Sequence, residues 1–189
     1  MLIKLERYGI RGICHKFIES YLLNRTQYTN FQQVDSEHCY IKYGVPQGSV
    51  LGPLLFLIYI NGIANSSQDG QFVLFADDTN VFVTGKNEED VYSKANKVLE
   101  NISEYMISNQ LHINQIKSVY MHFRPDNWAS CARAREYGSE KFLMLNGKKL
   151  LREDKVKYLG VIIDDQLSWK PQIEHLRQKL NSSINIINN

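Results

Sequence analysis

The stretch FVLFADDTNVFV, residues 72–83, sets two adjacent aspartates, Asp77 and Asp78, between runs of mainly apolar residues. Such runs on either side of a short polar pair predict a β-hairpin with a two-residue turn. Two-residue hairpin turns favour Asn-Gly or Asp-Gly because their central residues take positive φ, so Asp-Asp is a poor choice on conformational grounds. Adjacent carboxylates also repel each other unless a cation lies beside them. The pair is therefore either a plain solvent-facing turn or a site for a divalent ion.

The second alternative has a definite chemistry. Mg²⁺ in proteins is commonly held by one or two carboxylates together with the phosphate groups of a substrate. A hairpin that ends in two aspartates is therefore a candidate site for phosphoryl transfer, in which metal ions contact the attacking and the leaving oxygen.

Length and composition indicate one ordinary globular folding unit. The chain has 189 residues, of which 43% are apolar, and its net charge of +2 neither argues for a nucleic-acid partner nor opposes one. Cys14, Cys39 and Cys131 form no CxxC pair, which predicts thiols in a reducing compartment. Charged residues interrupt the N-terminal apolar residues, and the apolar run over 50–60 is too short to cross a bilayer. We therefore expect an intracellular protein that does not enter a membrane.

The patterning predicts a mixed α+β fold, in which an antiparallel sheet packs against helices. The Pro/Gly turn GVPQGS, residues 44–49, places Ser49 where it can cap the next helix, which Asn61-Gly62 ends. In chain order we expect helices over 1–8 and 13–22, short strands within 26–43, a helix after 49, the hairpin over 72–83, a helix capped by Asn87, a strand over 111–123, a loop over 124–140, a hairpin over 143–151 around Asn146-Gly147, a strand over 156–163 and a helix over 171–187.

Several motifs in a fixed order resemble the reverse transcriptase family, in its non-LTR, LINE- and jockey-like branch. GVPQGSVLGP, residues 44–53, is followed by FADD at 75–78. The further similar blocks are YGIRG at 8–12, YLLNRTQ at 21–27, LHINQIKSVYMHF at 111–123 and VKYLGVIIDDQLSW at 156–169. Two short motifs can coincide by chance, whereas this ordered set covers nearly the whole chain.

The resemblance implies the palm of a reverse transcriptase, with incomplete fingers and only the start of a thumb. Residues 1–189 would form a partial reverse transcriptase domain. In it, residues 1–45 would be helices and strands before the PQG block, residues 46–163 the palm core, and residues 164–189 the start of the thumb.

The same resemblance assigns roles around the aspartate pair. Asp77 and Asp78 would be two of the family's three metal-binding, catalytic aspartates, with Mg²⁺ as the ion and Mn²⁺ as the alternative. Phe75 and Ala76 would fill the first two positions of the motif, beside the nucleotide and template.

Two further segments would approach the nucleotide. Pro46, Gln47 and Gly48 would lie beside the incoming nucleotide and the template, where small residues let the backbone come close to a base pair. Without the other motifs, PQG is equally well explained as a simple turn before a helix. Lys117 would act as a proton donor or positive charge toward the phosphates, although a lone lysine in a strand is otherwise a solvated one.

The primer would meet the last block of the chain. By resemblance, Tyr158, Leu159 and Gly160 form the primer grip, and a buried strand explains them equally well. The segment from Lys141 to Lys179 carries nine basic against five acidic residues, an excess that attracts a nucleic-acid backbone or belongs to a solvated face. The implied partners are an RNA template, a DNA primer and deoxynucleotides.

One part of the family's active site has no match. The first metal-binding aspartate belongs to a block upstream of the segment that resembles MLIKLERYGIRG, which opens this sequence. We therefore expect a piece of a longer element or a truncated copy, with little or no polymerase activity by itself. The alternatives are a non-catalytic remnant that at most binds RNA or an RNA–DNA hybrid, and an RNA-templated RNA polymerase, against which FADD together with YLGV argues.

Overall fold

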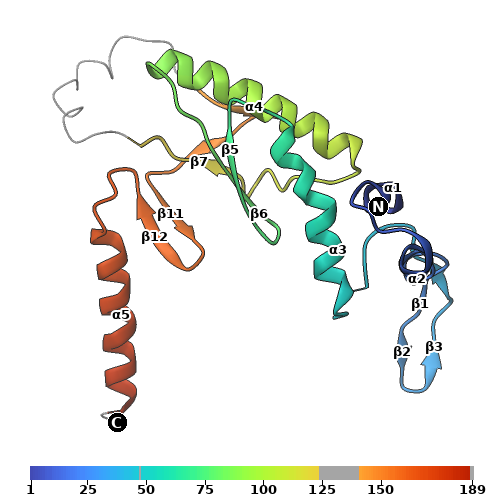
Figure 1. The fold of residues 1–189 in the computed structure, drawn as a ribbon. Coiled ribbons are helices and arrows are strands. Elements are labelled where there is room, and N and C mark those ends of the chain that lie inside the picture. Colours follow the sequence, from blue (N-terminus) through green and yellow to red (C-terminus); the bar gives the residue numbers. More distant parts are fainter. Residues whose placement is uncertain (47, 124–140, 188–189) are drawn as a thin grey trace. The chain divides into compact units, whose positions relative to one another are not determined.

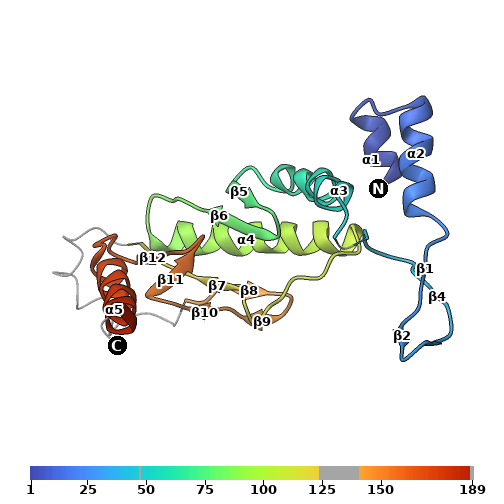
Figure 2. The ribbon, with the colours of Figure 1, turned by 90° about the horizontal axis from the view of Figure 1, so that it is seen from below.

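The computed structural model describes residues 1–46, 48–123 and 141–187, with side chains up to Asn181 (Figures 1 and 2). The chain divides into two compact units, Met1–Phe82 and Val83–Asn189. The sequence suggested a single folding unit, and the division instead falls directly after the central hairpin. Each unit is described by itself. The expected loop over 124–140 lies outside the described residues.

Helices form the buried part of the first unit. They are α1 (Leu2–Arg7), α2 (Gly12–Leu22) and α3 (Leu51–Ile60), and α1 contacts both of the others. Leu5 and Leu55 are almost completely buried, and the Lys4 ammonium donates to the Tyr59 carbonyl at 2.7 Å. The expected stop at Asn61-Gly62 is correct only for the α-helix, because the chain continues directly as the 3₁₀ helix η1 (Asn61–Asn65).

Short strands between α2 and α3 form two successive antiparallel ladders, as the sequence predicted. β1 (Thr26–Gln27) pairs with β4 (Cys39–Tyr40), and β2 (Asn30–Phe31) pairs with β3 (Val34–Asp35). All eight of these residues are exposed. The thiols of Cys14 and Cys39 are free.

The central hairpin is present, but its turn lies one residue earlier than the aspartate pair. β5 (Gln71–Phe75) pairs antiparallel with β6 (Asp78–Phe82), from Gln71↔Phe82 to Phe75↔Asp78. The two turn residues are therefore Ala76 and Asp77, and Asp78 begins the second strand. Ala76 has φ 51°.

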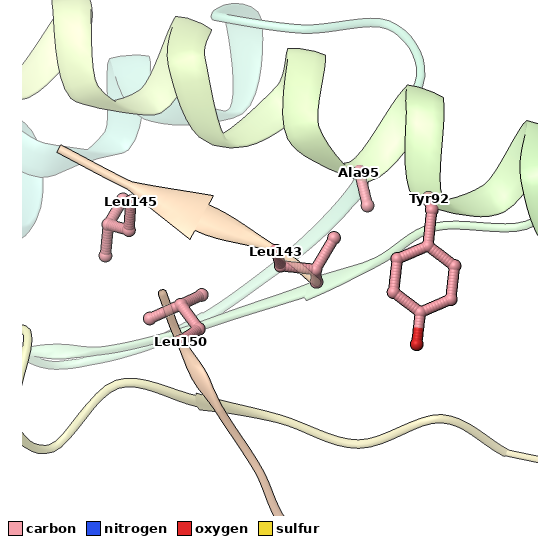
Figure 3. Packing of buried hydrophobic residues seen from close by; sticks show 5 residues of the cluster. All are labelled: Tyr92, Ala95, Leu143, Leu145 and Leu150. Carbon is pink, nitrogen blue, oxygen red and sulfur yellow. The ribbon is translucent and has the colours of Figure 1, made fainter. Parts of the chain in front are cut away.

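The second unit is built on α4 (Glu88–Ser108), whose first turn follows the prediction. The Asn87 side chain caps it by accepting from the Asp90 amide at 2.8 Å. Tyr92 and Ala95 of this helix form a buried cluster with Leu143, Leu145 and Leu150 (Figure 3). Burial of the Tyr92 phenol raises its pKa to about 12, with a contribution from its hydrogen bond with Tyr120.

Two hairpins follow, one of them expected. β8 (Met144–Leu145) and β9 (Lys148–Lys149) enclose Asn146 and Gly147, whose φ values of 50° and 76° confirm the predicted turn. The Asn96 side chain of α4 accepts from the Met144 amide at 2.9 Å and donates to the Phe142 carbonyl at 3.3 Å. In this way α4 supplies hydrogen-bond partners to a backbone amide and a backbone carbonyl at the start of β8.

Two expected strands differ from the structure. Of residues 111–123 only β7 (Val119–Tyr120) is a strand, and it pairs in parallel with β10 (Leu151–Arg152). The Asn114 carbonyl and side chain instead hold a turn before it by accepting from residues 117 and 118. The strand over 156–163 is a hairpin of β11 (Lys155–Tyr158) and β12 (Val161–Asp164), because Leu159 and Gly160 take φ of 47° and 88°.

The last helix, α5 (Lys170–Ile187), confirms the prediction for 171–187. It is joined to β12 by two sets of hydrogen bonds. The Gln172 side chain accepts from the Ile162 amide at 2.8 Å. The buried Asp164 carboxylate accepts from the Ser168 hydroxyl at 2.7 Å and the Ser168 amide at 2.9 Å, which lowers the pKa of Asp164 below its usual value.

The fold is α+β in the coarse sense that was predicted, with helices and mainly antiparallel strands. Within the described ranges the strands pair two by two, and one extended antiparallel sheet is not formed. The described helices include none that is both long and apolar enough to span a membrane.

Candidate functional site

The GVPQGS turn lies in the first unit, between β4 and α3. Gly44 and Gly48 have φ of 85° and 77°, in the left-handed region that glycine adopts without strain. The Ser49 hydroxyl accepts from the Gly52 amide at 3.1 Å, so Ser49 caps α3 as predicted. The same hydroxyl donates to the Pro46 carbonyl at 2.7 Å, which closes the turn onto the helix. Gln47 lies outside the described residues.

Two side chains, one in the last turn of α2 and one just after the helix, also hold this turn, a role that the sequence did not reveal. The Tyr21 hydroxyl donates to the Ser49 hydroxyl at 2.5 Å, and the Arg25 guanidinium donates to the Gly44 carbonyl at 2.6 Å. Tyr21 and Arg25 are four residues apart at the C-terminal end of the helical pattern, just before a Pro/Gly turn. Their partners are 28 and 19 residues away, so no local pattern in the sequence points to these contacts.

Gly52 is needed for the close approach of turn and helix. A Cβ at this position would lie 2.8 Å from the Ser49 hydroxyl oxygen and 2.9 Å from the Pro46 carbonyl oxygen. Both distances are shorter than real Cβ atoms show. Gly52, the third glycine of GVPQGSVLG, is therefore required by the packing of the turn against the helix.

The tip of the β5–β6 hairpin presents both aspartates to solvent. Ala76, Asp77 and Asp78 are exposed. Asp78 lies opposite Phe75, and the Phe75 side chain is 58% exposed although it is a large apolar group. The tip therefore joins two carboxylates to an exposed aromatic ring.

The PQG turn and the hairpin tip belong to the same unit. Helix α3 runs away from the turn, and β5 returns in the opposite direction, so both lie toward the same end of this unit (Figure 1).

The other predicted site residues lie in the second unit. Lys117 is exposed and sits in a turn, rather than in the strand that was expected. Its amide donates to the Asn114 side chain at 3.2 Å. Tyr158 is the half-buried last residue of β11, and Leu159 and Gly160 form the exposed turn of the β11–β12 hairpin. The alternative of a buried strand therefore does not hold for Leu159, which is 47% exposed, or for Gly160.

The residues at the hairpin tip suit part of a divalent-metal site. Two adjacent carboxylates offer the hard oxygen ligands that Mg²⁺ prefers, with an open side for phosphate and water. Among the described residues, however, no cluster of three or more His, Cys, Asp or Glu side chains is placed to hold a metal ion. The donor set fits a metal site that a substrate or another carboxylate completes.

The match to a protein-family model shows the family of this chain. The family model described as reverse transcriptase (RNA-dependent DNA polymerase) matches residues 2–163. The chain belongs to this family.

Similar curated reverse transcriptases come from mobile elements of flies. The RNA-directed DNA polymerase from mobile element jockey of Drosophila melanogaster is 25% identical over 174 residues, which are 88% of this chain and 18% of that protein. The probable RNA-directed DNA polymerase from transposon X-element of the same species is 27% identical, again over 88% of this chain and 18% of its own length. The jockey polymerase of Drosophila funebris is 26% identical over 79% of this chain and 16% of its own length.

These matches confirm the resemblance to non-LTR, jockey-like reverse transcriptases. The chain spans less than a fifth of the length of the curated relatives that it matches. It corresponds to a part of such a reverse transcriptase.

Proposed function

We propose that this chain is the palm portion of an RNA-directed DNA polymerase of a retrotransposon, which extends a DNA primer along an RNA template. The observation that carries the proposal is the exposed aspartate pair at the tip of β5–β6. It lies toward the same end of the first unit as the PQG turn. In that reaction the primer 3′-OH attacks the α-phosphorus of a deoxynucleotide and pyrophosphate leaves.

Asp77 and Asp78 would hold Mg²⁺, or Mn²⁺ in its place. When bound, such ions stabilise negative charge on the attacking and leaving oxygens. The residues of the chain would bind the nucleotide and the template and orient them. Pro46, Gln47 and Gly48 would lie beside the base pair formed by nucleotide and template, where the lack of a side chain at Gly48 lets the backbone come close.

The second unit would supply contacts to phosphate and primer. Lys117 is exposed and carries a positive charge for the phosphates of the nucleotide. Tyr158, Leu159 and Gly160 present a hairpin tip with the exposed Leu159 side chain to the primer end. Both segments belong to the predicted palm core, residues 46–163.

A second candidate is a non-catalytic remnant that binds RNA or an RNA–DNA hybrid. One observation favours it: the described residues bring only two carboxylates together at the tip, without a third ligand. Loss of one preorganised electrostatic contact in an active site can lower a rate by about 10²–10³. We therefore expect the chain by itself to show little or no DNA synthesis.

Primer extension by the purified chain, with Mg²⁺, an RNA template and all four deoxynucleotides, tests synthesis directly. Binding of Mn²⁺, followed by electron paramagnetic resonance in the presence of hybrid and nucleotide, tests the site even when synthesis is absent. Asp77→Asn combined with Asp78→Asn should abolish that binding, and Asp69→Asn, an exposed aspartate of the preceding loop, should leave it unchanged.

The outcomes separate the candidates. Robust synthesis would refute the expected inactivity and the remnant hypothesis together. Hybrid binding without Mn²⁺ binding would favour the remnant. If the double variant bound Mn²⁺ as tightly as the parent chain, the metal-binding role of Asp77 and Asp78 would be wrong.

A further inference from the structure

The GVPQGS turn is held at both ends by side chains from one short segment. Before the turn, the Arg25 guanidinium donates to the Gly44 carbonyl at 2.6 Å. It also donates to the carbonyl of Leu22, the last residue of α2, at 3.3 Å. After the turn, the Tyr21 hydroxyl donates to the Ser49 hydroxyl at 2.5 Å. Both donors belong to the C-terminal end of α2 and the residues that follow it.

The Ser49 hydroxyl is saturated by these contacts. A serine hydroxyl has one donor and two acceptor positions. It donates to the Pro46 carbonyl, and it accepts from the Tyr21 hydroxyl and from the Gly52 amide. Its orientation is therefore fixed, and the bond from Tyr21 strengthens the bond to Pro46 because successive hydrogen bonds polarise one another.

Capping of α3 does not require the contacts from α2. The cap needs only the Gly52 amide and the Ser49 oxygen, and the Gly44 carbonyl lies outside the helix altogether. What Tyr21 and Arg25 share is the turn itself. They fix its two ends, between which Pro46 and Gly48 lie.

We infer that Tyr21 and Arg25 are positioning residues for nucleotide binding, which act by holding the GVPQGS turn in its observed conformation. This inference rests on the proposed function, in which the turn faces the incoming nucleotide. Neither side chain needs to touch the nucleotide. Tyr21 acts through Ser49 and the Pro46 carbonyl, and Arg25 acts through the Gly44 carbonyl.

The test uses the whole chain with Tyr21→Phe and Arg25→Met, each of which removes the donor and keeps most of the side-chain volume. Ser49→Thr is the conservative variant, since threonine keeps the hydroxyl. Tyr40→Phe is the matched control, because Tyr40 is a 75% exposed tyrosine of the same unit. Two quantities are measured: ¹⁵N order parameters of Gly44 and Gly48, and affinity for the next complementary deoxynucleotide with Mg²⁺ and an annealed RNA–DNA primer–template.

In Tyr21→Phe and Arg25→Met we expect the order parameters to fall from the value of rigid backbone, about 0.85, toward the flexible range below about 0.6. Nucleotide affinity should fall about fivefold in Tyr21→Phe, the factor that corresponds to one neutral hydrogen bond, and at least as much in Arg25→Met, whose donor is charged. Ser49→Thr and Tyr40→Phe should match the parent chain in both measurements. A purely structural role would lower thermal stability and leave nucleotide affinity per folded molecule unchanged.

Unchanged order parameters in both donor variants would overturn the inference, whatever the measured nucleotide affinity. Lower order parameters with unchanged affinity would also overturn it, since the turn would then not need this conformation to bind. If the parent chain bound no nucleotide at all, the proposed function would fail. The order parameters would then still show whether Tyr21 and Arg25 hold the turn.

Discussion

Replacing Gly52 with alanine adds one methyl group at the point where the GVPQGS turn meets the first turn of α3. In an ordinary helix this change is stabilising by up to ~1 kcal/mol, because glycine is the poorer helix former. Here the added Cβ would lie 2.8 Å from the Ser49 oxygen and 2.9 Å from the Pro46 oxygen, with Val45 at 3.5 Å. The Pro46 carbonyl is backbone and cannot simply rotate away.

The structure gives the size of the effect. Overpacking of this kind costs about 1–3 kcal/mol. Moving Ser49 to relieve it breaks between one and three hydrogen bonds, to Pro46 and from Gly52 and Tyr21, at ~1 kcal/mol each. The loss of one of these bonds, at ~1 kcal/mol, offsets the gain in helix propensity, so we expect Gly52→Ala to destabilise the first unit by about 1–3 kcal/mol.

Urea unfolding, followed by circular dichroism, measures this difference. Ser20→Ala, on the exposed face of α2, serves as the control and should change the free energy of unfolding by less than about 0.5 kcal/mol. Ser49→Ala combined with Gly52→Ala should be less destabilised than the sum of the single variants, since one clash partner is gone. A Gly52→Ala chain as stable as the parent would refute the close approach of turn and helix.

Three further predictions concern the second unit. Because the folded-state pKa of Asp164 is lowered, its stabilising effect is present above the usual value of 3.8 and is lost as pH falls through the lowered one. Ser168→Ala should therefore unfold at a higher pH in an acid titration followed by circular dichroism, and an unchanged midpoint would contradict this. Because burial raises the pKa of Tyr92 to about 12, its stabilising effect is present below pH 10.0 and is lost as pH rises toward 12. Tyr92→Phe should thus lose less stability than the parent across that range in urea titrations. Asn96→Ala removes two hydrogen bonds to the backbone beside β8 and should lower the free energy of unfolding by about 1–2 kcal/mol, measured in urea. A variant as stable as the parent chain would contradict this.

Turn chemistry decided which hairpins the sequence could predict. Asn146-Gly147 was recognised because both residues adopt positive φ readily, and they do so in the structure. Leu159-Gly160 has the same pair of positive φ values, but leucine gives no turn signal, and the apolar run around it indicated one unbroken strand. Between Asn114 and Ser118, a side-chain capped turn replaced a predicted strand for a similar reason: local hydrogen bonding overrode the alternation of residues.

The candidate site was predictable where it depends on near neighbours. Ser49 is three residues from the amide that it caps, so the cap could be read from the sequence. Tyr21 and Arg25 are 28 and 19 residues from their partners, and no local pattern records contacts across such distances. The motifs identified the turn and the aspartate pair, whereas the contacts that fix the turn could be found only in the folded structure.

The tip of β5–β6 combines three unfavourable local features in four consecutive residues. Ala76 takes φ 51° at the first turn position, where glycine would avoid the cost of about 1–2 kcal/mol that an L-residue incurs there. Asp77 and Asp78 add like charges, and Phe75 adds an exposed aromatic ring, at the same tip. A hairpin selected only for stability would have none of these four choices. Backbone strain and unpaired charge persist where a site requires them, and a bound divalent ion would remove the repulsion between the carboxylates. The physical cost of this tip is therefore consistent with the proposed metal-binding role of Asp77 and Asp78, which the Mn²⁺-binding experiment tests.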